Sequence, residues 1–369
     1  MKIALVINIP APYRIPVFEK LAEYLGDDFL VVFAARSEPN RSWNIKELKF
    51  NHLFLNENIT EKKDGFNYVH NNIDVIKQLK IFNPDTIITT GFNPTHLYAW
   101  MFAKLFGKKH LTMTDGTIAT EKHLSWLHKI IRRIVFSTSH AFIGAGKQSL
   151  ALYKSYGIPA QSIFQSHLCA GNERFQNQNS FDKRSYGLMF SGQFTERKLP
   201  FFFAEIAKKV SLIRPDIRVL ILGSGPLKES FLKQLENDRI DYTYPGFVSQ
   251  EELPRYYSDT KLFLFTTRLD PWGVVANEAL ASGTPVLVTP HAGLANDLIM
   301  DGENGYILET NSDIWTERII AILDDQKQWQ RLSNNAIESV STYTFENAAK
   351  GILNACNYAN TQNLSKRDT

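Results

Sequence analysis

Two carboxylates and a glycine stand close together in the second half of the chain. Asp270 follows an apolar stretch, 262–267, and Glu278 comes after seven intervening residues, with Gly273 between the two. The segment 274–283 is expected to form a helix, and the first N–H groups of a helix lack intrahelical partners, so they can receive a diphosphate. The spacing therefore predicts an anion site at a helix N-terminus with a carboxylate on either side.

Two neighbouring cations begin another expected helix. Arg197 and Lys198 follow the expected strand 186–191 across a turn that contains Gly192 and Gln193. Cations are unfavourable in the first turn of a helix unless an anion compensates for them. Their position indicates phosphate binding, and a solvated surface pair is the alternative interpretation.

Glycines mark a third loop. Gly223 and Gly225 follow the expected strand 217–222, and Pro226 opens the next expected helix. Glycine lets a ligand approach the backbone closely. Such turns are common between strands and helices, so this loop supports a site only together with the other two.

The three loops occur in an order that resembles the signature of family 4 retaining glycosyltransferases, also described as group 1. In that family two acidic residues are separated by seven positions, as Asp270 and Glu278 are. The resemblance covers residues 186–310 and includes Tyr244-Pro245-Gly246-Phe247-Val248, Leu253-Pro254-Arg255-Tyr256-Tyr257 and Asp301-Gly302-Glu303-Asn304-Gly305-Tyr306. It implies an α/β protein of the GT-B fold, with two doubly wound Rossmann-like domains facing a cleft.

The resemblance also implies roles for individual residues. Glu278 would hold the donor ribose, Asp270 would contact the transferring sugar, and Lys198 falls where the family has its phosphate-binding lysine. The other expected donor-binding residues are Gly192, Gln193, Arg197, Gly223, Gly225, Phe247, Val248, Trp272, Gly273 and Val274. The backbone amides of the last three would hold the diphosphate, and Phe247 and Val248 would flank the base. A surface carboxylate and a helix cap are the alternatives for the two acids.

Two positions depart from the family pattern. The first acid is usually Glu, and Asp270 is one methylene shorter, which predicts an altered sugar contact. Many members carry Arg where this chain has Gln193, and Arg197 is the candidate to supply that charge.

The chain shows no Asp-x-Asp motif and no histidine or carboxylate cluster with metal-ligand spacing. We therefore expect no metal and no cofactor, with the nucleotide sugar as a substrate, and the charge on the departing phosphate must be stabilised by Lys198, Arg197 and helix amides. On the acceptor side, Asp115 follows the expected strand 110–114 and is a candidate to orient an acceptor hydroxyl. A turn or helix cap is its alternative role.

Apolar runs rich in β-branched residues alternate with helical segments twice along the chain, which is typical of parallel sheets covered by helices. Expected strands are 2–9, 29–35, 85–90, 110–114, 140–144, 186–191, 217–222, 262–267 and 285–289. Expected helices are 14–25, 68–82, 95–106, 121–136, 147–156, 199–213, 226–237, 274–283 and 311–341. The expected domains are an acceptor-binding domain at 1–170, a linker at 171–184 and a nucleotide-sugar-binding domain at 185–340. A helix at 341–360 could return to the first domain, and 361–369 would be a disordered tail.

The charge is distributed unevenly. Residues 1–170 carry 20 Lys and Arg against 13 Asp and Glu, whereas residues 171–369 carry 21 against 25. The basic first half favours an anionic partner, and nothing in the chain resembles a nucleic-acid-binding module. In the expected helix 121–136, Lys122, Lys129, Arg132 and Arg133 share a face that could meet an anionic membrane or a lipid diphosphate, with an ordinary solvated helix as the alternative.

Together these features predict a retaining, metal-independent glycosyltransferase of hexosyltransferase type, acting on a saccharide or lipid-linked saccharide. Surface polysaccharide or glycolipid biosynthesis is the expected pathway, because the segment 11–16 is reminiscent of members that build surface polysaccharides. A non-catalytic nucleotide-sugar-binding subunit is the alternative. Neither a signal peptide nor a membrane-spanning run is evident, and two distant cysteines lack metal-ligand spacing. These observations predict a cytoplasmic protein, with peripheral contact at the inner face of the cell membrane as a further expectation.

Overall fold

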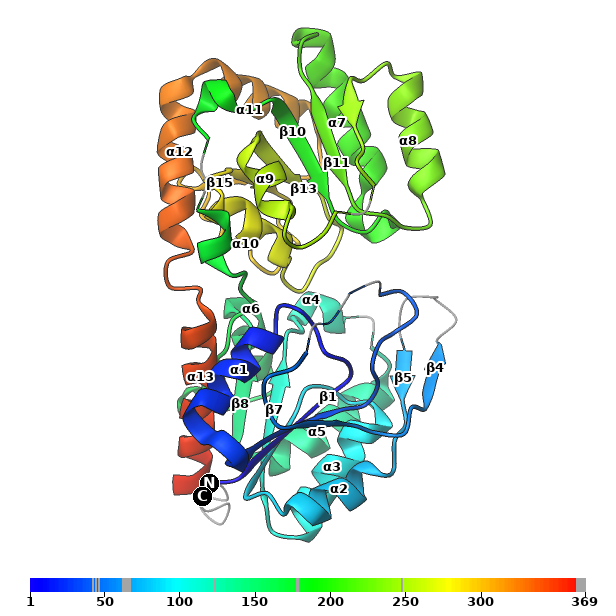
Figure 1. Ribbon diagram of the computed structural model, residues 1–369, viewed down its shortest axis with the longest axis vertical. Helices are drawn as coiled ribbons and strands as arrows, with labels where there is room; N and C mark the ends of the chain where they lie inside the picture. The colour runs from blue at the N-terminus through cyan, green and yellow to red at the C-terminus, as the bar shows by residue number, and fades with distance from the viewer. Residues whose placement is uncertain are drawn as a thin grey trace. The chain divides into compact units, whose positions relative to one another are not determined.

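The computed structural model describes residues 1–362 except 42, 44, 46, 62–67, 123, 177–178 and 247. The chain forms two compact units. The first contains Met1–Leu168 and the segment that begins at Phe345, and the second contains Cys169–Thr344. Each unit is an α/β layer structure with its own parallel sheet (Figure 1).

The first unit contains a seven-stranded parallel sheet in the order β3-β2-β1-β6-β7-β8-β9. Its strands are β1 (Ile3–Ile7), β2 (Phe29–Phe33), β3 (His52–Phe54), β6 (Thr86–Thr89), β7 (Lys109–Thr114), β8 (Ala141–Gly144) and β9 (Ile163–Gln165). A separate antiparallel pair consists of β4 (Ile59–Glu61) and β5 (Tyr68–His70). All five residues of β2 are buried, as expected for a strand covered on both faces.

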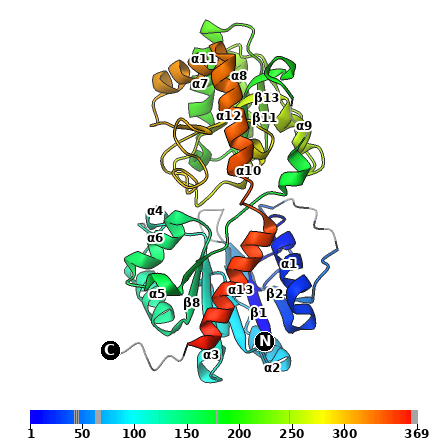
Figure 2. The ribbon, with the colours of Figure 1, turned by 90° about the vertical axis from the view of Figure 1, so that its left-hand side faces the viewer.

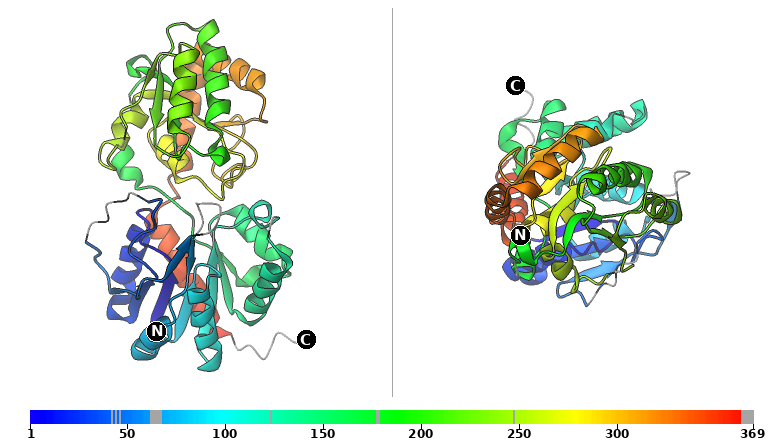
Figure 3. Two further views of the ribbon diagram at one scale, coloured as in Figure 1. Left: turned by 90° about the vertical axis from the view of Figure 1, so that its right-hand side faces the viewer. Right: turned by 90° about the horizontal axis from the view of Figure 1, so that it is seen from above.

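Helices cover both faces of this sheet (Figure 3). They are α1 (Ile15–Leu25), α2 (Val75–Phe82), α3 (Pro94–Leu105), α4 (Ile118–Glu121), α5 (Trp126–Thr138), α6 (Lys147–Ser155) and α13 (Phe345–Thr361). Part of the core lies between the sheet and helices α2 and α3, where Val6, Val32 and Ile87 pack against Leu79 and Phe102.

The second unit contains a six-stranded parallel sheet in the order β12-β11-β10-β13-β14-β15. Its strands are β10 (Tyr186–Ser191), β11 (Val219–Leu222), β12 (Tyr242–Thr243), β13 (Thr260–Phe265), β14 (Val286–Val288) and β15 (Gly305–Ile307). Its helices are α7 (Pro200–Ile213), α8 (Lys228–Asn237), α9 (Leu253–Ser258), α10 (Val274–Ala281), α11 (Ser312–Asp324) and α12 (Gln326–Ser339).

In each sheet the order of the strands reverses once. In the second unit the strand order reverses between β10 and β13, and in the first unit between β1 and β6. Ligands of doubly wound sheets bind beyond the carboxyl ends of the strands at such a reversal. The loops after β10 and β13 are therefore the expected position of a ligand site in the second unit.

Three expected helices differ in the structure. The expected helix 121–136 is interrupted, because α4 ends at Glu121 and α5 begins only at Trp126, where the Ser125 side chain caps it; Lys122 therefore lies outside α5. Tyr68–His70, at the start of the expected helix 68–82, forms strand β5, and the helix begins only at Val75. The expected helix 311–341 is divided into α11 and α12 at Asp325, whose carboxylate accepts hydrogen bonds from the N–H groups of Lys327 and Gln328. Aspartate favours this capping position, which explains the break.

The segment 171–184 contains buried residues. Phe175 is almost fully buried and packs against Tyr257. The Arg184 guanidinium donates hydrogen bonds to the carbonyls of Thr260 and Ser282, among others, and burial lowers the pKa of Arg184 to about 10. This arginine therefore ties the start of the second unit to its sheet and to the end of α10.

Helix α13 belongs to the first unit, where it packs against α1 and strands β7, β8 and β9 (Figure 2). Its buried face is made mainly of small residues: Ala348, Ala349, Ile352, Ala355, Cys356 and Ala359. Gly351 lies so close to the backbone that a Cβ atom there would be 1.8 Å from the carbonyl oxygen of Gln165. In the described part of the chain, no helix is long and apolar enough to cross a membrane.

Candidate anion site in the second unit

Lys198, Arg197 and Asp270 form a cation–carboxylate cluster in the second unit. Lys198 Nζ and Arg197 Nη1 each lie 2.6 Å from Asp270 Oδ2. Lys198 and Asp270 are buried, whereas the Arg197 side chain is about half exposed. The cations follow β10 and the carboxylate follows β13, so the cluster lies where the strand order reverses.

The loop after β13 holds the cations in place. The Thr266 hydroxyl donates a hydrogen bond to the Lys198 carbonyl, and the Thr267 hydroxyl donates one to the Arg197 carbonyl, both at 3.1 Å. Leu199, the next residue, has a left-handed backbone with φ of 51°, which is uncommon for a residue other than glycine. Sequence reasoning missed both threonines, and their position directly after an apolar strand is the signal that could have identified them.

Burial and charge act in opposite directions on the paired groups. Burial would raise the pKa of the Asp270 carboxyl, but the charges of Lys198 and Arg197 and their hydrogen bonds hold it below its usual value. Burial lowers the pKa of Lys198, and the attraction of Asp270 only partly compensates. The Lys198 ammonium also lies 4.3 Å from the centre of the Phe265 ring. The cluster carries two cations and one carboxylate, so it keeps a net positive charge.

The predicted glycines bring two loops into close contact. A Cβ atom on Gly223 would lie 1.9 Å from the carbonyl oxygen of Gly192, and one on Gly225 would lie 2.6 Å from that of Phe194. Both residues also have positive φ angles, 122° and 159°. No side chain fits at either position, so the loops after β10 and β11 can pack backbone to backbone. Gln193 is half-buried in the first of these loops.

Helix α10 begins next to the cluster. Gly273 precedes it with φ of 109°, and a Cβ atom there would lie 2.4 Å from the Phe265 ring. Val274 is the first helical residue, and the N–H groups of a first helical turn lack intrahelical partners. The Trp272 amide donates instead to Asp270 Oδ1 at 3.1 Å, and its indole is buried and donates to Asn277. Of the three expected diphosphate amides, the one at Trp272 is therefore engaged by Asp270.

Glu278 lies inside α10 and is buried. Burial raises the pKa of Glu278 to about 7, although a hydrogen bond from the Tyr257 side chain and the charge of Arg174 oppose the shift. The Tyr257 hydroxyl also contacts Ser191 Oγ at 3.3 Å, at the end of β10. Through Tyr257, the Glu278 side chain is thus linked to the C-terminal end of β10. Val248 is half-buried, and Phe247 lies outside the described residues.

The first unit has a cavity of about 230 Å³ near its own reversal point. Asn8, Thr90 and Asp115, which follow strands β1, β6 and β7, contribute to its lining. Tyr13 and Trp43 line it as well and meet edge to face at 6.2 Å. The structure therefore places Asp115 at the carboxyl edge of the first sheet, in a different unit from the cluster around Asp270.

Among the described residues, no three His, Cys, Asp or Glu side chains form a group that could hold a metal ion. The cluster instead offers cations and helix N–H groups, which bind phosphate oxygens.

The part of the chain that contains the cluster is also the part that resembles a known protein family. Residues 171–339 match the family model described as Glycosyl transferases group 1. An uncharacterized glycosyltransferase of Methanocaldococcus jannaschii is 28% identical over 172 residues, which are 45% of this chain and 43% of that protein, less than half of its length. An uncharacterized 41.2 kDa protein in the cps region of Klebsiella pneumoniae is 24% identical over 286 residues, which are 71% of this chain and 77% of that protein.

A solved structure extends the comparison to both units. The crystal structure of Anabaena HepE in complex with UDP matches 97% of this chain and 100% of its own chain, with a TM-score of 0.77 and 14% sequence identity. Another crystal structure of the same protein contains UDP-glucose. At this identity the match concerns the fold.

Proposed function

We propose that this chain transfers a sugar from a nucleotide diphosphate donor to a saccharide or lipid-linked saccharide, because residues 171–339 belong to the glycosyl transferases group 1 family and the chain has the GT-B fold. The observation that carries this proposal is the cluster of Lys198, Arg197 and Asp270 beside the N-terminus of α10. Two cations and a helix N-terminus at a strand-order reversal suit a diphosphate.

The cluster supports a division of roles in the reaction. When the sugar leaves, negative charge grows on the β-phosphate of the nucleoside diphosphate. Lys198 and Arg197 would stabilise that charge without a metal ion, and Asp270, which already contacts both, would face the transferring sugar. The family resemblance supports a retaining reaction, in which the acceptor attacks from the face that the phosphate leaves and the phosphate takes the acceptor proton.

Two further features support donor binding. Glu278 is a buried carboxylate that could accept hydrogen bonds from the ribose hydroxyls once it is ionised. Thr195 Oγ1, just ahead of the cations, is buried and has no hydrogen-bond partner. A buried hydroxyl without a partner is costly, and a bound ligand would supply one.

UDP-sugars are the donors that we propose, since the similarly folded HepE was solved with UDP. The acceptor would bind in the cavity of the first unit, where Asp115 could orient a hydroxyl and Tyr13 and Trp43 could pack on a sugar ring. The relative from the Klebsiella cps region supports surface polysaccharide biosynthesis as the pathway.

A thermal-shift panel of UDP-, GDP-, ADP- and dTDP-sugars tests the proposal. A ligand that binds only the folded state stabilises it by an amount set by its affinity. We expect UDP-sugars to raise the melting temperature most, and slow release of UDP from the preferred donor should follow when acceptor is absent. Stabilisation by none of the four would refute nucleotide-sugar binding, and stabilisation without any turnover on saccharide acceptors would favour a non-catalytic binding subunit.

A further inference from the structure

Helix α5 exposes large apolar side chains. Trp126 is 72% exposed and Leu127 is 51% exposed, and Ile130 and Ile134 are exposed as well. At about 3.6 residues per turn, Trp126, Ile130 and Ile134 form one stripe with Leu127 beside it. Single exposed apolar residues are ordinary, but four on one helical face indicate an interaction surface.

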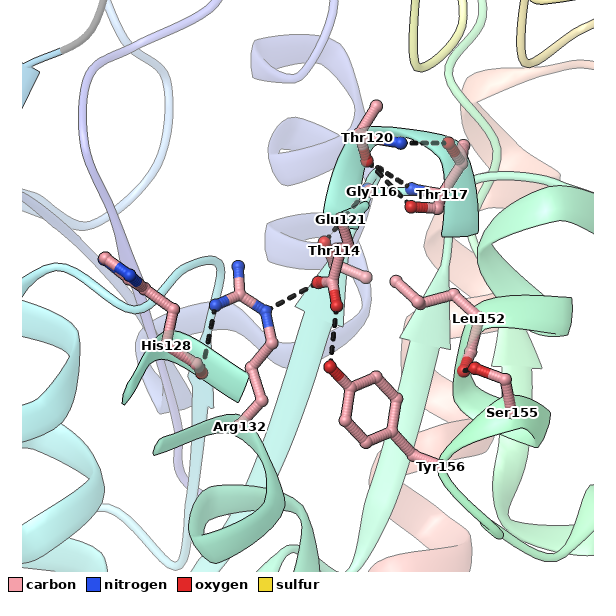
Figure 4. A network of polar contacts seen from close by, with 10 residues as sticks. All are labelled: Thr114, Gly116, Thr117, Thr120, Glu121, His128, Arg132, Leu152, Ser155 and Tyr156. Carbon is pink, nitrogen blue, oxygen red and sulfur yellow. Dashed lines mark hydrogen bonds and ion pairs between the residues drawn. The ribbon is translucent and has the colours of Figure 1, made fainter. Parts of the chain in front are cut away.

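The orientation of this face is fixed by contacts on the opposite side of the helix. Arg132 donates a hydrogen bond to Glu121 at 2.6 Å, and Glu121 accepts another from the Tyr156 hydroxyl at 2.8 Å (Figure 4). The Arg132 guanidinium also lies 4.2 Å from the centre of the Phe92 ring, and Phe136 is buried. The inner face of α5 is therefore held by a charged pair and an aromatic core, so the apolar stripe must point outward.

These contacts correct one sequence-based expectation. Arg132 was expected on the same exposed face as Lys122, Lys129 and Arg133, but its side chain is only 13% exposed and is neutralised by Glu121. Lys129 and Arg133 remain exposed, one turn apart, beside the apolar stripe. No acidic residue occurs from Trp126 to Thr138. The face therefore joins apolar side chains to an uncompensated positive charge.

Helix α3, on the same side of the sheet, also exposes apolar side chains next to a cation. Strands β6, β7 and β8 are neighbours in that order, so right-handed crossovers place α3 and α5 on one face of the sheet. The Trp100 indole of α3 donates a hydrogen bond to Thr138 Oγ1 at the end of α5. Met101, Leu105 and Phe106 are exposed here, together with Lys104.

We propose that this face of the first unit docks on an anionic lipid bilayer. We call it the α5 face and define it by Trp126, Leu127, Lys129, Ile130, Arg133 and Ile134. Interfacial helices bind membranes by inserting apolar side chains while neighbouring cations attract anionic head groups. Both parts are present on the α5 face, and the net positive charge of residues 1–170 acts in the same direction.

Vesicle sedimentation tests this inference without relying on glycosyl transfer. The full-length protein is mixed with vesicles of phosphatidylcholine alone or of equimolar phosphatidylcholine and phosphatidylglycerol. We expect binding to the anionic vesicles at low salt and little binding to the neutral ones. Trp126→Ser with Ile130→Ser should weaken binding by at least about ten-fold, since both apolar anchors are removed. Lys129→Gln with Arg133→Gln should weaken it by about 25-fold, roughly five-fold for each cation, and should reduce its salt dependence.

The second unit provides a matched control. Leu212 and Ile213, at the end of α7, are exposed to a similar extent, so Leu212→Ser with Ile213→Ser removes similar apolar area elsewhere and should leave vesicle binding unchanged. All variants are compared by melting temperature and UDP binding, which separates a loss of fold or of donor binding from a loss of docking. If wild-type protein ignores anionic vesicles, or if neither α5 variant weakens binding, the proposal is wrong. Loss of a dimer in the Trp126→Ser, Ile130→Ser variant, seen by ultracentrifugation without vesicle binding, would assign the face to a second copy of the chain.

Discussion

The ammonium group of Lys198 lies 2.6 Å from Asp270 Oδ2, and the guanidinium of Arg197 lies at the same distance from the same oxygen. One carboxylate oxygen therefore holds both cations expected to receive a phosphate. A diphosphate arriving at this cluster must compete with Asp270 for its two cations. This competition makes the effects of substituting Asp270 and Lys198 different from each other.

Asp270→Asn should bind UDP more tightly but turn over more slowly. Removing the carboxylate raises the net charge of the cluster, and we expect roughly ten-fold stronger UDP binding by calorimetry. The same change removes the expected sugar contact, so kcat should fall while KM for the donor also falls. The matched control is Asp313→Asn, which breaks an exposed ion pair with Lys209 of the same 2.6 Å length. Weaker UDP binding in Asp270→Asn would show that the carboxylate does not compete with phosphate.

Lys198→Ala should lower turnover by about 10²-fold or more, because it removes a preorganised charge that stabilises the departing phosphate. Lys209→Ala is its control, since Lys209 is also a paired lysine of the second unit but lies at the surface. Steady-state rates with the preferred donor would measure both. Activity of Lys198→Ala within a few-fold of wild type would remove Lys198 from the reaction.

Glu278→Gln tests ribose binding. The amide preserves the shape of the side chain but removes the charge that would accept the ribose hydroxyl hydrogens, and charge-assisted bonds are about twice as strong as neutral ones. We expect UDP to bind about ten-fold more weakly at pH 8, whereas inorganic pyrophosphate, which has no ribose, should bind as before. Equal UDP affinity in the two proteins would exclude the role.

The same residue makes the stability of the unliganded protein depend on pH. Its pKa is about 7 in the folded chain and 4.5 in the reference state, so the folded protein retains a proton that the unfolded chain releases. This contribution is fully present below pH 4.5 and is lost as pH rises through 7. This pH dependence should be absent in Glu278→Gln. The free energy of unfolding of the variant minus that of wild type should therefore increase by up to about 3 kcal/mol between pH 5 and pH 8. Urea unfolding of both proteins across this range measures the difference, and a constant difference would contradict it.

Activity should be independent of divalent ions, because in the proposed site Lys198 and Arg197 would stabilise the departing phosphate in place of a metal. Initial rates in EDTA and in Mg²⁺ or Mn²⁺ should agree within about two-fold. A loss in EDTA that Mg²⁺ restores would show that the cluster alone does not suffice.

The predicted elements and the observed ones agree where apolar runs were long. Strands β10 and β13 and helices α7 and α10 lie close to their expected positions, because a buried parallel strand is a continuous apolar run. Three-residue strands such as β9 and β15 were missed, since so short a segment shows no period.

Side-chain pairing was less predictable. Sequence analysis put Asp270 and Lys198 in one site, but not in one ion pair, because their contact depends on how two loops pack. The inward orientation of Arg132 was missed for a similar reason. Its partner Glu121 lies eleven residues earlier in a different helix, so no helical spacing within α5 could reveal the pair.

The return of α13 to the first unit affects the order in which the chain can fold during synthesis. Residues 1–168 leave the ribosome long before Phe345–Thr361, so β7, β8 and β9 are at first not covered by α13. The second unit, 169–344, is contiguous and can fold as soon as it emerges. Domains usually fold in N-to-C order during translation. Here the first unit can complete its core only after α13 is released, so the side of its sheet that α13 covers stays open until late in synthesis.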